Sequence, residues 1–215
     1  MDNLVWVDCE MTGLSLERDA LIEVAALVTD KDLNVLGDGI DVVIKPPAGA
    51  LEQMDPFVVE MHQHSGLLAE LDAGMALADA EAAVLAYIRQ FVPEAGKAPL
   101  AGNTIGTDRS FLARDMPELE GYLHYRNVDV SSLKELAKRW FPRIVFCAPE
   151  KQGNHRALAD IQESIEELRY YRETLFIPEP GPDRASLAVI AAKHRGSLTG
   201  LGDGAPGVAG VSATA

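Results

Sequence analysis

Two carboxylates, Asp8 and Glu10, stand two residues apart where a short apolar run ends, in the sequence LVWVDCE. If this run is a strand, both carboxylates point to one face and Cys9 points the other way, into the core. Neighbouring carboxylates repel each other unless a positive group lies between them, and hard cations such as Mg²⁺ or Mn²⁺ prefer oxygen ligands. The pair indicates a metal site, although a strand that ends at the surface explains an isolated Asp-x-Glu more readily.

Three further residues, Asp108, His155 and Asp160, extend this candidate site. Residues 102–108 (GNTIGTD) form a turn-rich passage into an expected helix whose first turn contains Asp108. A carboxylate there also has a simpler explanation, because a negative charge at a helix N-terminus is worth about 0.3–1 kcal/mol. Five residues of helix turn through about 500°, so His155 and Asp160 share a face poorly unless His155 precedes the helix. The residues Gly153 and Asn154 favour such an entry.

Strands and helices in mixed order are expected to position these residues. Runs rich in Val, Ile and Leu predict strands at 4–8, 20–29, 35–44 and 99–102, the first three as antiparallel neighbours. Helical spacing and end signals predict helices at 77–92, 108–114, 131–140 and 155–176, with Ser131 as an N-cap. This succession favours an α/β domain with helices on both sides of a mixed sheet.

The composition changes after residue 177. Pro178, Pro180 and Pro182 interrupt any helix, and residues 183–195 predict one short further helix without catalytic character. Residues 196–215 are rich in Gly, Ala and Ser, which predicts a disordered tail. The expected organisation is a catalytic domain over 1–177, a proline-broken segment over 178–195 and a tail over 196–215.

Composition and charge narrow the class of protein. A chain of 215 residues with 47% hydrophobic content can bury one substantial core. The best apolar stretch, SLAVIAA at 186–192, falls far short of the ~18–20 residues that cross a bilayer, so no membrane partner is expected. Cys9 and Cys147 lie far apart and no leader-like start precedes them, which favours a reduced, cytoplasmic setting. The net charge of −14 would repel a long polyanion, and therefore constrains substrate length.

Taken together, Asp8 with Glu10, the distant Asp108, and His155 with Asp160 resemble the signature of the DEDDh branch of the 3′–5′ exonucleases. Four longer segments narrow this resemblance to the oligoribonuclease family: MTGL at 11–14, GNTIGTDRSFL at 102–112, MPELEGYLHYRNVDVSSLKEL at 116–136 and NHRALADIQESIEELRYYR at 154–172. The likeness extends over roughly residues 3–177. It implies a ribonuclease-H-like α/β fold and a 3′-to-5′ exoribonuclease that degrades very short RNAs, especially dinucleotides, to nucleoside 5′-monophosphates.

The resemblance also implies a role for each residue of the signature. Asp8 would bridge two divalent ions, Mg²⁺ or Mn²⁺, in a two-metal hydrolysis. Glu10 and Asp160 would complete the ion nearer the attacking water, and Asp108 would hold the other. His155 would be the base that takes the proton of the water, because imidazole has a suitable basicity at neutral pH.

Substrate contacts follow from the same resemblance. Leu14 and Phe57 would pack against the terminal bases, and the family usually has Trp at the position of Phe57, so stacking here is expected to be weaker. His62 and Thr104 would contact the RNA backbone or a 5′ phosphate. From the residues alone, Phe57 reads as a core side chain, His62 as an exposed helix residue and Thr104 as a turn hydroxyl.

The segment His124-Tyr125-Arg126 would come from a partner subunit and cap the 5′ phosphate, which implies a homodimer and a restriction to very short RNA. Arg126 suits this role because its planar fork binds phosphate through two hydrogen bonds. Ser131 and Ser132 would add donors at a helix start, where an anion is favoured. Without the resemblance, Tyr125 and Arg126 read as a surface pair in a loop.

Two other functions fit the same residues. An exonuclease that acts on longer RNA or DNA, such as a proofreading subunit, shares all five residues of the signature. A nucleotide-binding module without catalysis would use the acidic cluster only to hold metal, and the intact set Asp8, Glu10, Asp108, His155 and Asp160 argues against it.

Overall fold

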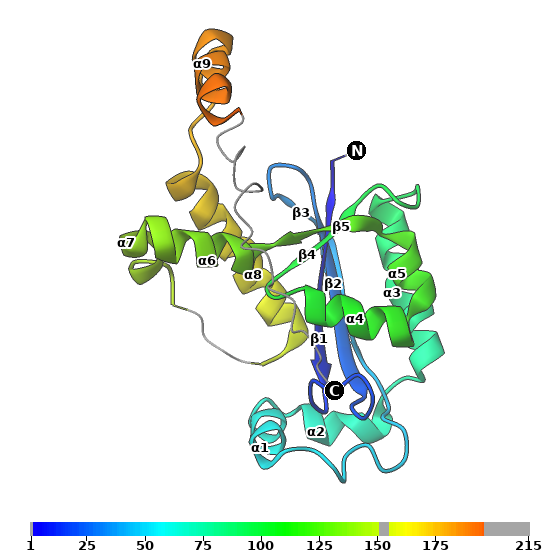
Figure 1. Ribbon diagram of the computed structural model, residues 1–215. Coiled ribbons are helices and arrows are strands. Elements are labelled where there is room, and N and C mark those ends of the chain that lie inside the picture. The colour runs from blue at the N-terminus through cyan, green and yellow to red at the C-terminus, as the bar shows by residue number, and fades with distance from the viewer. Residues whose placement is uncertain (1, 151–154, 196–215) are drawn as a thin grey trace, which may run out of the picture. The chain divides into compact units, whose positions relative to one another are not determined.

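The computed structural model describes residues 2–150 and 155–195, which contain a five-stranded sheet (Figure 1). The strands are β1 (Leu4–Met11), β2 (Leu21–Thr29), β3 (Val35–Val43), β4 (Pro99–Gly102) and β5 (His124–Asp129). Their order across the sheet is β3-β2-β1-β4-β5. β2 is antiparallel to β1 and β3, whereas β1, β4 and β5 are parallel. The expected mixed sheet, with its first three strands as antiparallel neighbours, is confirmed.

Helices cover both faces of this sheet (Figure 1). One face carries α3 (Leu77–Phe91), α4 (Gly106–Asp115) and α5 (Pro117–Tyr122), and the other carries α6 (Val130–Trp140) and α8 (Ala157–Leu175). Along β1, Val5 and Val7 enter the core beneath α3 and α4, and Trp6 is fully buried in the core beneath α8. Because side chains alternate on a strand, the even-numbered residues of β1 face α8.

Among the described residues, short helices complete the fold, three near β2 and one beside α6 and α8. They are α1 (Pro56–His64), α2 (Leu67–Glu70), the 3₁₀ turn η1 (Leu71–Ala73) and α7 (Pro142–Phe146). Pro56 opens α1, and the side chain of its N-cap Asp55 accepts a hydrogen bond of 2.8 Å from the Phe57 N–H. A small apolar cluster attaches α2 and η1 to β2, through Ile22, Leu67 and Leu71.

Some elements differ from the sequence predictions. Ser131 is not the N-cap of α6, because the helix begins at Val130 and the Asp129 carboxylate accepts a 2.9 Å hydrogen bond from the Ser131 N–H. The edge strand β5 and the short helices α1, α2, α5 and α7 escape prediction because they are brief and lack a clear apolar period. His155 precedes α8, which begins at Ala157, as expected.

The chain divides into two compact units, Met1–Phe176 and Ile177–Ala215. The second unit contains α9 (Arg184–His194), whose N-cap Asp183 accepts a 2.7 Å hydrogen bond from the Ser186 N–H. This helix matches the short one expected within 183–195. The tail predicted over 196–215 lies outside the described residues. Among the residues described, no helix is both long and apolar enough to cross a membrane.

Candidate active site

The carboxyl end of β1 carries the first two residues of the site. Trp6 closes the apolar core beneath α8, and the next two side chains on the same face are Asp8 and Glu10. Glu10 is 9% exposed, so its carboxyl is largely removed from water. Cys9 is buried on the opposite face, in the core beneath α3, as the alternation predicts.

Two further residues of the site, His155 and Asp160, lie at the start of α8. Asp160 lies in the first turn of the helix, and His155 lies just before it with a φ of +48°. Glu10, His155 and Asp160 each place one possible ligand atom within 4.8 Å of the others. Residues separated by more than 140 positions in sequence therefore meet because α8 crosses the even-numbered face of β1.

Asp108 approaches β1 from the other face of the sheet, which α3, α4 and α5 cover. It lies in the first turn of α4, which follows β4, and is 7% exposed. Its Oδ1 accepts a 3.1 Å hydrogen bond from the N–H of Cys9, the residue between the two carboxylates of β1. On β1, the residues that pair with β4 end at Trp6. The Cys9 N–H therefore has no partner on β4 and is available to the Asp108 carboxylate.

Burial and mutual repulsion raise the pKa values of these carboxyls. The pKa of Glu10 rises to about 8, chiefly through burial and then through Asp160 and Glu23. Burial raises the pKa of Asp108 to about 6, although hydrogen bonds favour its charged form. The pKa of Asp8 is raised well above its ordinary value by burial, followed by Asp108 and Glu10. The cluster therefore holds protons that a bound cation would displace.

The chemistry of the donor set suits a hard divalent cation. Its four carboxyl groups supply oxygen ligands, which Mg²⁺ and Mn²⁺ prefer, and His155 adds one nitrogen at the exposed border. A cation among the carboxylates would offset both the burial and the mutual repulsion that raise the pKa values of Asp8 and Glu10. The residues present therefore fit a metal site.

Leu14 and Phe57, the predicted base-stacking pair, are strongly exposed, at 76% and 72%. Leu14 lies in the loop between β1 and β2, and Phe57 in the first turn of α1. The helix is tied to the end of β1 because Nε2 of His62 lies 2.9 Å from the Met11 carbonyl oxygen. Phe57 is thus not a core residue, and both side chains are open to a ligand.

His62 is fully buried and is therefore not an exposed helix residue. Its Nδ1 lies 3.9 Å from Oε2 of Glu10 and has no hydrogen-bond partner among the described residues. Burial lowers the pKa of His62, which favours the neutral ring. With Nε2 donating to Met11, Nδ1 faces the acidic cluster as an acceptor. Direct contact of this ring with RNA stays a prediction.

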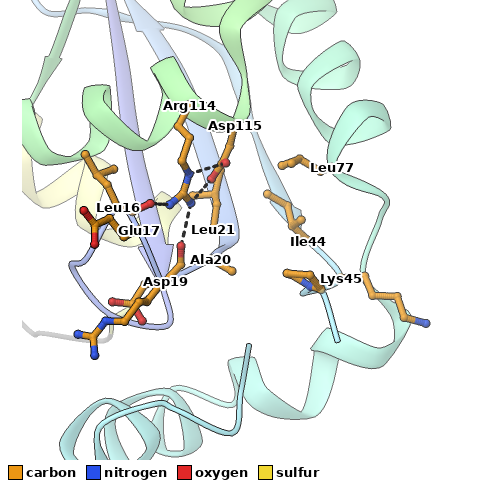
Figure 2. Close-up of a pocket in the computed structure, with 12 residues that line it drawn as sticks. Leu16, Glu17, Asp19, Ala20, Leu21, Ile44, Lys45, Leu77, Arg114 and Asp115 are labelled. Carbon is orange, nitrogen blue, oxygen red and sulfur yellow. Dashed lines mark hydrogen bonds and ion pairs between the residues drawn. The ribbon is translucent and has the colours of Figure 1, made fainter. Parts of the chain in front are cut away.

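The loop that carries Leu14 is fastened from α4 (Figure 2). Arg114, near the end of that helix, donates to the carbonyl oxygens of Leu16 and, at 2.8 Å, of Asp19. The same guanidinium pairs with both oxygens of Asp115, at 2.7 and 2.6 Å. A cavity of about 340 Å³ opens beside this loop, and none of the five signature residues lines it.

Thr104, Ser131 and Ser132, three predicted substrate contacts, line one cavity of about 590 Å³. The Thr104 N–H donates to Oγ of Ser131 at 3.0 Å and to Oδ1 of Asp129 at 3.1 Å. Ser131 in turn donates to Oδ1 of Asn103 at 3.0 Å. The structure thus gathers these hydroxyls at the N-terminus of α6, where the helix dipole favours an anion.

Tyr125 and Arg126 lie on the edge strand β5 and are not brought to the acidic cluster of their own chain. The register places Val128 level with Trp6. Tyr125 precedes this level and Glu10 follows it, so they are about 20 Å apart along the strands at about 3.3 Å per residue. Tyr125 is 72% exposed, and the Arg126 guanidinium carbon lies 5.4 Å from the centre of its ring.

Two residues that contact the site are absent from the sequence prediction. Glu23, on β2, lies directly opposite Glu10 and is fully buried. Arg156 follows His155 and forms an ion pair with Glu23 at 2.8 Å. A single charged residue inside the apolar run LIEVAALV is the signal that points to Glu23, because an isolated charge is costly to bury without a partner.

Comparisons with known proteins agree with this geometry. The family model described as Exonuclease matches residues 5–168. The oligoribonuclease of Streptomyces coelicolor is 70% identical over 193 residues, which cover 90% of this chain and 96% of that protein. The oligoribonuclease of Cutibacterium acnes is 68% identical over 199 residues, which cover 93% of this chain and 98% of that protein.

Solved structures share the fold at low sequence identity. Exonuclease I from Methylocaldum szegediense aligns with a TM-score of 0.60 at 20% identity, over 81% of this chain and 41% of that one. Exonuclease I of E. coli in complex with a dA16 oligonucleotide aligns with a TM-score of 0.63 at 18% identity, over 81% of this chain and 42% of that one. Identities this low establish the fold alone, and the expected α/β architecture is confirmed.

Proposed function

The chain belongs to the oligoribonucleases within the exonuclease family and is a 3′–5′ exoribonuclease; we propose that its substrates are RNAs of two to a few nucleotides. It releases nucleoside 5′-monophosphates, and dinucleotides are its preferred substrates. The observation that carries the hydrolytic activity is the approach of Glu10, His155 and Asp160 to within 4.8 Å of one another at the end of β1. The net charge of −14 supports the restriction to short RNA.

Asp8, Glu10, Asp108 and Asp160 are the residues that would hold two divalent cations, Mg²⁺ or Mn²⁺. Such cations stabilise the charge on the attacking and leaving oxygens of a phosphodiester. Asp8 would help to hold the cations, because the charges of both Asp108 and Glu10 act on it. The raised pKa values of Asp8, Glu10 and Asp108 support this assignment, since burial leaves these carboxyls short of charge stabilisation that a cation would supply, and in Asp8 and Glu10 a cation would also offset the repulsion from the other carboxylates of the cluster.

His155 accepts the proton of the attacking water. Its ring is exposed at the border of the cluster and approaches Glu10 and Asp160, so a water there can contact both an acid and a base. A positioned base typically contributes about 10²–10⁴-fold to the rate.

Substrate binding divides between two places. Leu14 and Phe57 stack on the terminal bases, which both exposed side chains permit. His62 is fully buried and supports α1 through the Met11 carbonyl oxygen, so it would act on the substrate through the position of α1. Thr104, Ser131 and Ser132 would bind a 5′ phosphate in their shared cavity at the start of α6, which Arg139 also lines. The phosphate would compete with the Asp129 carboxylate for the N–H groups of Thr104 and Ser131.

The active form is a homodimer in which Tyr125 and Arg126 of one chain complete the site of the other. The distance of this pair from the acidic cluster of its own chain supports the assignment. A group of exposed apolar side chains on α6, on α7 and at the junction between them offers surface for the contact: Leu136, Trp140, Phe141 and Phe146. The enzyme works in the reducing cytoplasm, which both free thiols, buried Cys9 and exposed Cys147, support.

The net charge of −14 favours short substrates. A dinucleotide needs local contacts to one terminal phosphate, whereas a long strand would extend its phosphates over an acidic surface. Length restriction and charge are therefore linked in this chain.

Hydrolysis of 5′-phosphorylated RNAs of two to twenty nucleotides, with matched DNAs and with Mg²⁺ or Mn²⁺, tests the proposal. We expect kcat/KM to be highest for the dinucleotide and to fall with length. Equal values for 2-mers and 20-mers would identify an exonuclease of longer strands. Binding without any metal-dependent hydrolysis would identify a non-catalytic module. The control is His155→Ala, which should lose turnover and keep measurable RNA binding.

A further inference from the structure

Arg156 divides its guanidinium between two carboxylates on different elements. Its Nε donates to Oε1 of Glu23 on β2 at 2.8 Å. Its two terminal nitrogens donate to the two oxygens of Glu70 on α2, at 3.0 and 3.1 Å. The planar fork of arginine suits this arrangement, since it presents several donors in fixed directions. The residue beside His155 is thereby fixed to the sheet and to α2 at once.

Glu23 completes this attachment by holding the helix itself. Its second oxygen, Oε2, accepts a 3.1 Å hydrogen bond from the N–H of Ala157, the first residue of α8. That N–H has no partner within the helix, as is general for the first turn. Glu23 is fully buried and lies opposite Glu10 in the register of β1 and β2. A single carboxylate therefore joins the start of α8 to the strand beside the acidic cluster.

Residues 156 and 157 lie in the chain between the two site residues at the start of α8. His155 immediately precedes this stretch, and Asp160 follows within one turn of helix. His155 has a φ of +48°, in the left-handed region that non-glycine residues enter at a cost of about 1–2 kcal/mol. Such a conformation persists where neighbouring contacts hold it, and the adjacent residue Arg156 supplies such contacts.

We propose that Arg156 is a positioning residue, which, through Glu23 and Glu70, sets the distances of His155 and Asp160 from Glu10. The guanidinium of Arg156 thus fixes both the base His155 and the carboxylate of Asp160. Arg156 itself does not need to contact RNA for this role. The kinetic part of this inference rests on the proposed function, and the metal-binding part does not.

An attachment that merely stabilises α8 is the competing explanation, and the same helix offers a matched control. Arg172 lies near the other end of α8 and forms an ion pair of 3.1 Å with Asp32, which follows β2. Arg172→Ala removes an arginine that joins α8 to a segment of the sheet, far along the helix from the acidic cluster. Glu23 is fully buried whereas Asp32 is about half exposed, so Arg156→Ala should lower the unfolding temperature more than Arg172→Ala, and kcat and Mn²⁺ affinity are compared at a temperature at which both variants are folded.

The experiment compares Arg156→Ala, Arg156→Lys and Arg172→Ala in the full chain. It measures kcat and KM on a 5′-phosphorylated dinucleotide, Mn²⁺ affinity by calorimetry and the unfolding temperature. We expect Arg156→Ala to lower kcat about 10–100-fold with little change in KM, and to weaken Mn²⁺ binding, as when residues that orient a metal ligand are removed. Arg156→Lys keeps the charge without the fork and should recover little. Arg172→Ala should leave kcat and Mn²⁺ affinity unchanged.

A second comparison links the effect to the base. In a His155→Ala background, Arg156→Ala should cause a smaller further loss of kcat than it causes in the wild type, because one of the two groups that it positions is already absent. Three results would each overturn the proposal. The first is a loss of kcat in the His155→Ala background as large as that in the wild type. The others are full recovery of kcat in Arg156→Lys and equal effects of Arg156→Ala and Arg172→Ala on kcat and Mn²⁺ affinity. If Arg156→Ala does not fold, Glu70→Gln removes only the half-exposed arm of the fork and should lower kcat and Mn²⁺ affinity in the same direction. If the wild type fails to cleave dinucleotides, the proposed substrate is wrong, and the Mn²⁺ titrations still decide the role of Arg156.

Discussion

The N–H of Cys9 donates a 3.1 Å hydrogen bond to Oδ1 of Asp108, a residue 99 positions later in the chain. This bond attaches the first turn of α4 to the middle of the Asp8-Cys9-Glu10 segment. It also uses a strand N–H that the short β4 leaves unpaired. The backbone of β1 therefore fixes the position of the Asp108 side chain, and the charge of Asp108 raises the pKa of the neighbouring Asp8.

Asp108→Asn separates these two contributions, because an amide oxygen can still accept the bond from Cys9. Burial raises the pKa of Asp108 to about 6, so the charged carboxylate destabilises the metal-free protein at pH 8 by an amount on the order of 2–3 kcal/mol. We expect the metal-free variant to unfold at a higher temperature than the wild type, with turnover at least about 100-fold lower. Calorimetric unfolding at pH 8 and dinucleotide hydrolysis measure both. Lower stability with unchanged turnover would contradict the assignment.

The stability of the metal-free protein should fall as the pH rises. Glu10 and Asp108 have folded pKa values of about 8 and 6, above their ordinary values, so folding favours their protonated forms. Their contribution is complete below about pH 4 and is lost as the pH rises through 6 and then 8. We expect the unfolding temperature to decline over this window, and less so in Glu10→Gln.

Metal should reverse this decline. Mn²⁺ at about 100 times its dissociation constant stabilises the folded state by about 2.7 kcal/mol. Because the ion displaces protons, its affinity should increase from pH 6 to pH 8. Titration calorimetry at several pH values measures this dependence, and a pH-independent affinity would refute a site built on these protonated carboxyls.

The sequence is enough to predict the general fold and the placement of Asp8 and Glu10 on one face of β1. The period of two along β1 correctly places Cys9 in the core opposite Asp8 and Glu10. No local pattern states that Asp108 reaches Cys9, since a hydrogen bond across 99 residues depends on how β4 pairs with β1. Only the resemblance of the five residues as a set predicts that they belong together.

Other features escape prediction because they depend on partners far away in the chain. Glu23 reads as one charge in an apolar strand until Arg156, 133 residues later, forms its ion pair. The cap of α6 goes to Asp129 rather than Ser131, because the hydroxyl of Ser131 is directed to Asn103. The edge strand β5 follows from the parallel pairing with β4 and not from any apolar alternation of its own.

Arg114→Ala should affect substrate binding rather than the chemical step. The variant releases the carbonyls of Leu16 and Asp19, and so loosens the loop that carries the exposed side chain of Leu14. We expect KM for a dinucleotide to rise several-fold, as when about 1 kcal/mol of binding is lost, with kcat nearly unchanged. Steady-state kinetics measure this. In a Leu14→Ala background the same change should add little, and additive losses would separate Arg114 from base stacking.

Mixing two inactive variants decides whether Tyr125 acts across the dimer. His155→Ala removes the base, and Tyr125→Ala removes the exposed ring on β5 that lies too far from the acidic cluster of its own chain. In a mixed dimer, the chain with an intact His155 receives an intact Tyr125 from its partner, so one site of the two is complete. We therefore expect activity on dinucleotides to return, toward half of the wild-type value per mixed dimer, after the variants are unfolded and refolded together. Each variant refolded alone serves as the control. If Tyr125 instead acted within its own chain, neither site of the mixed dimer would hold both groups, and refolding together would restore nothing.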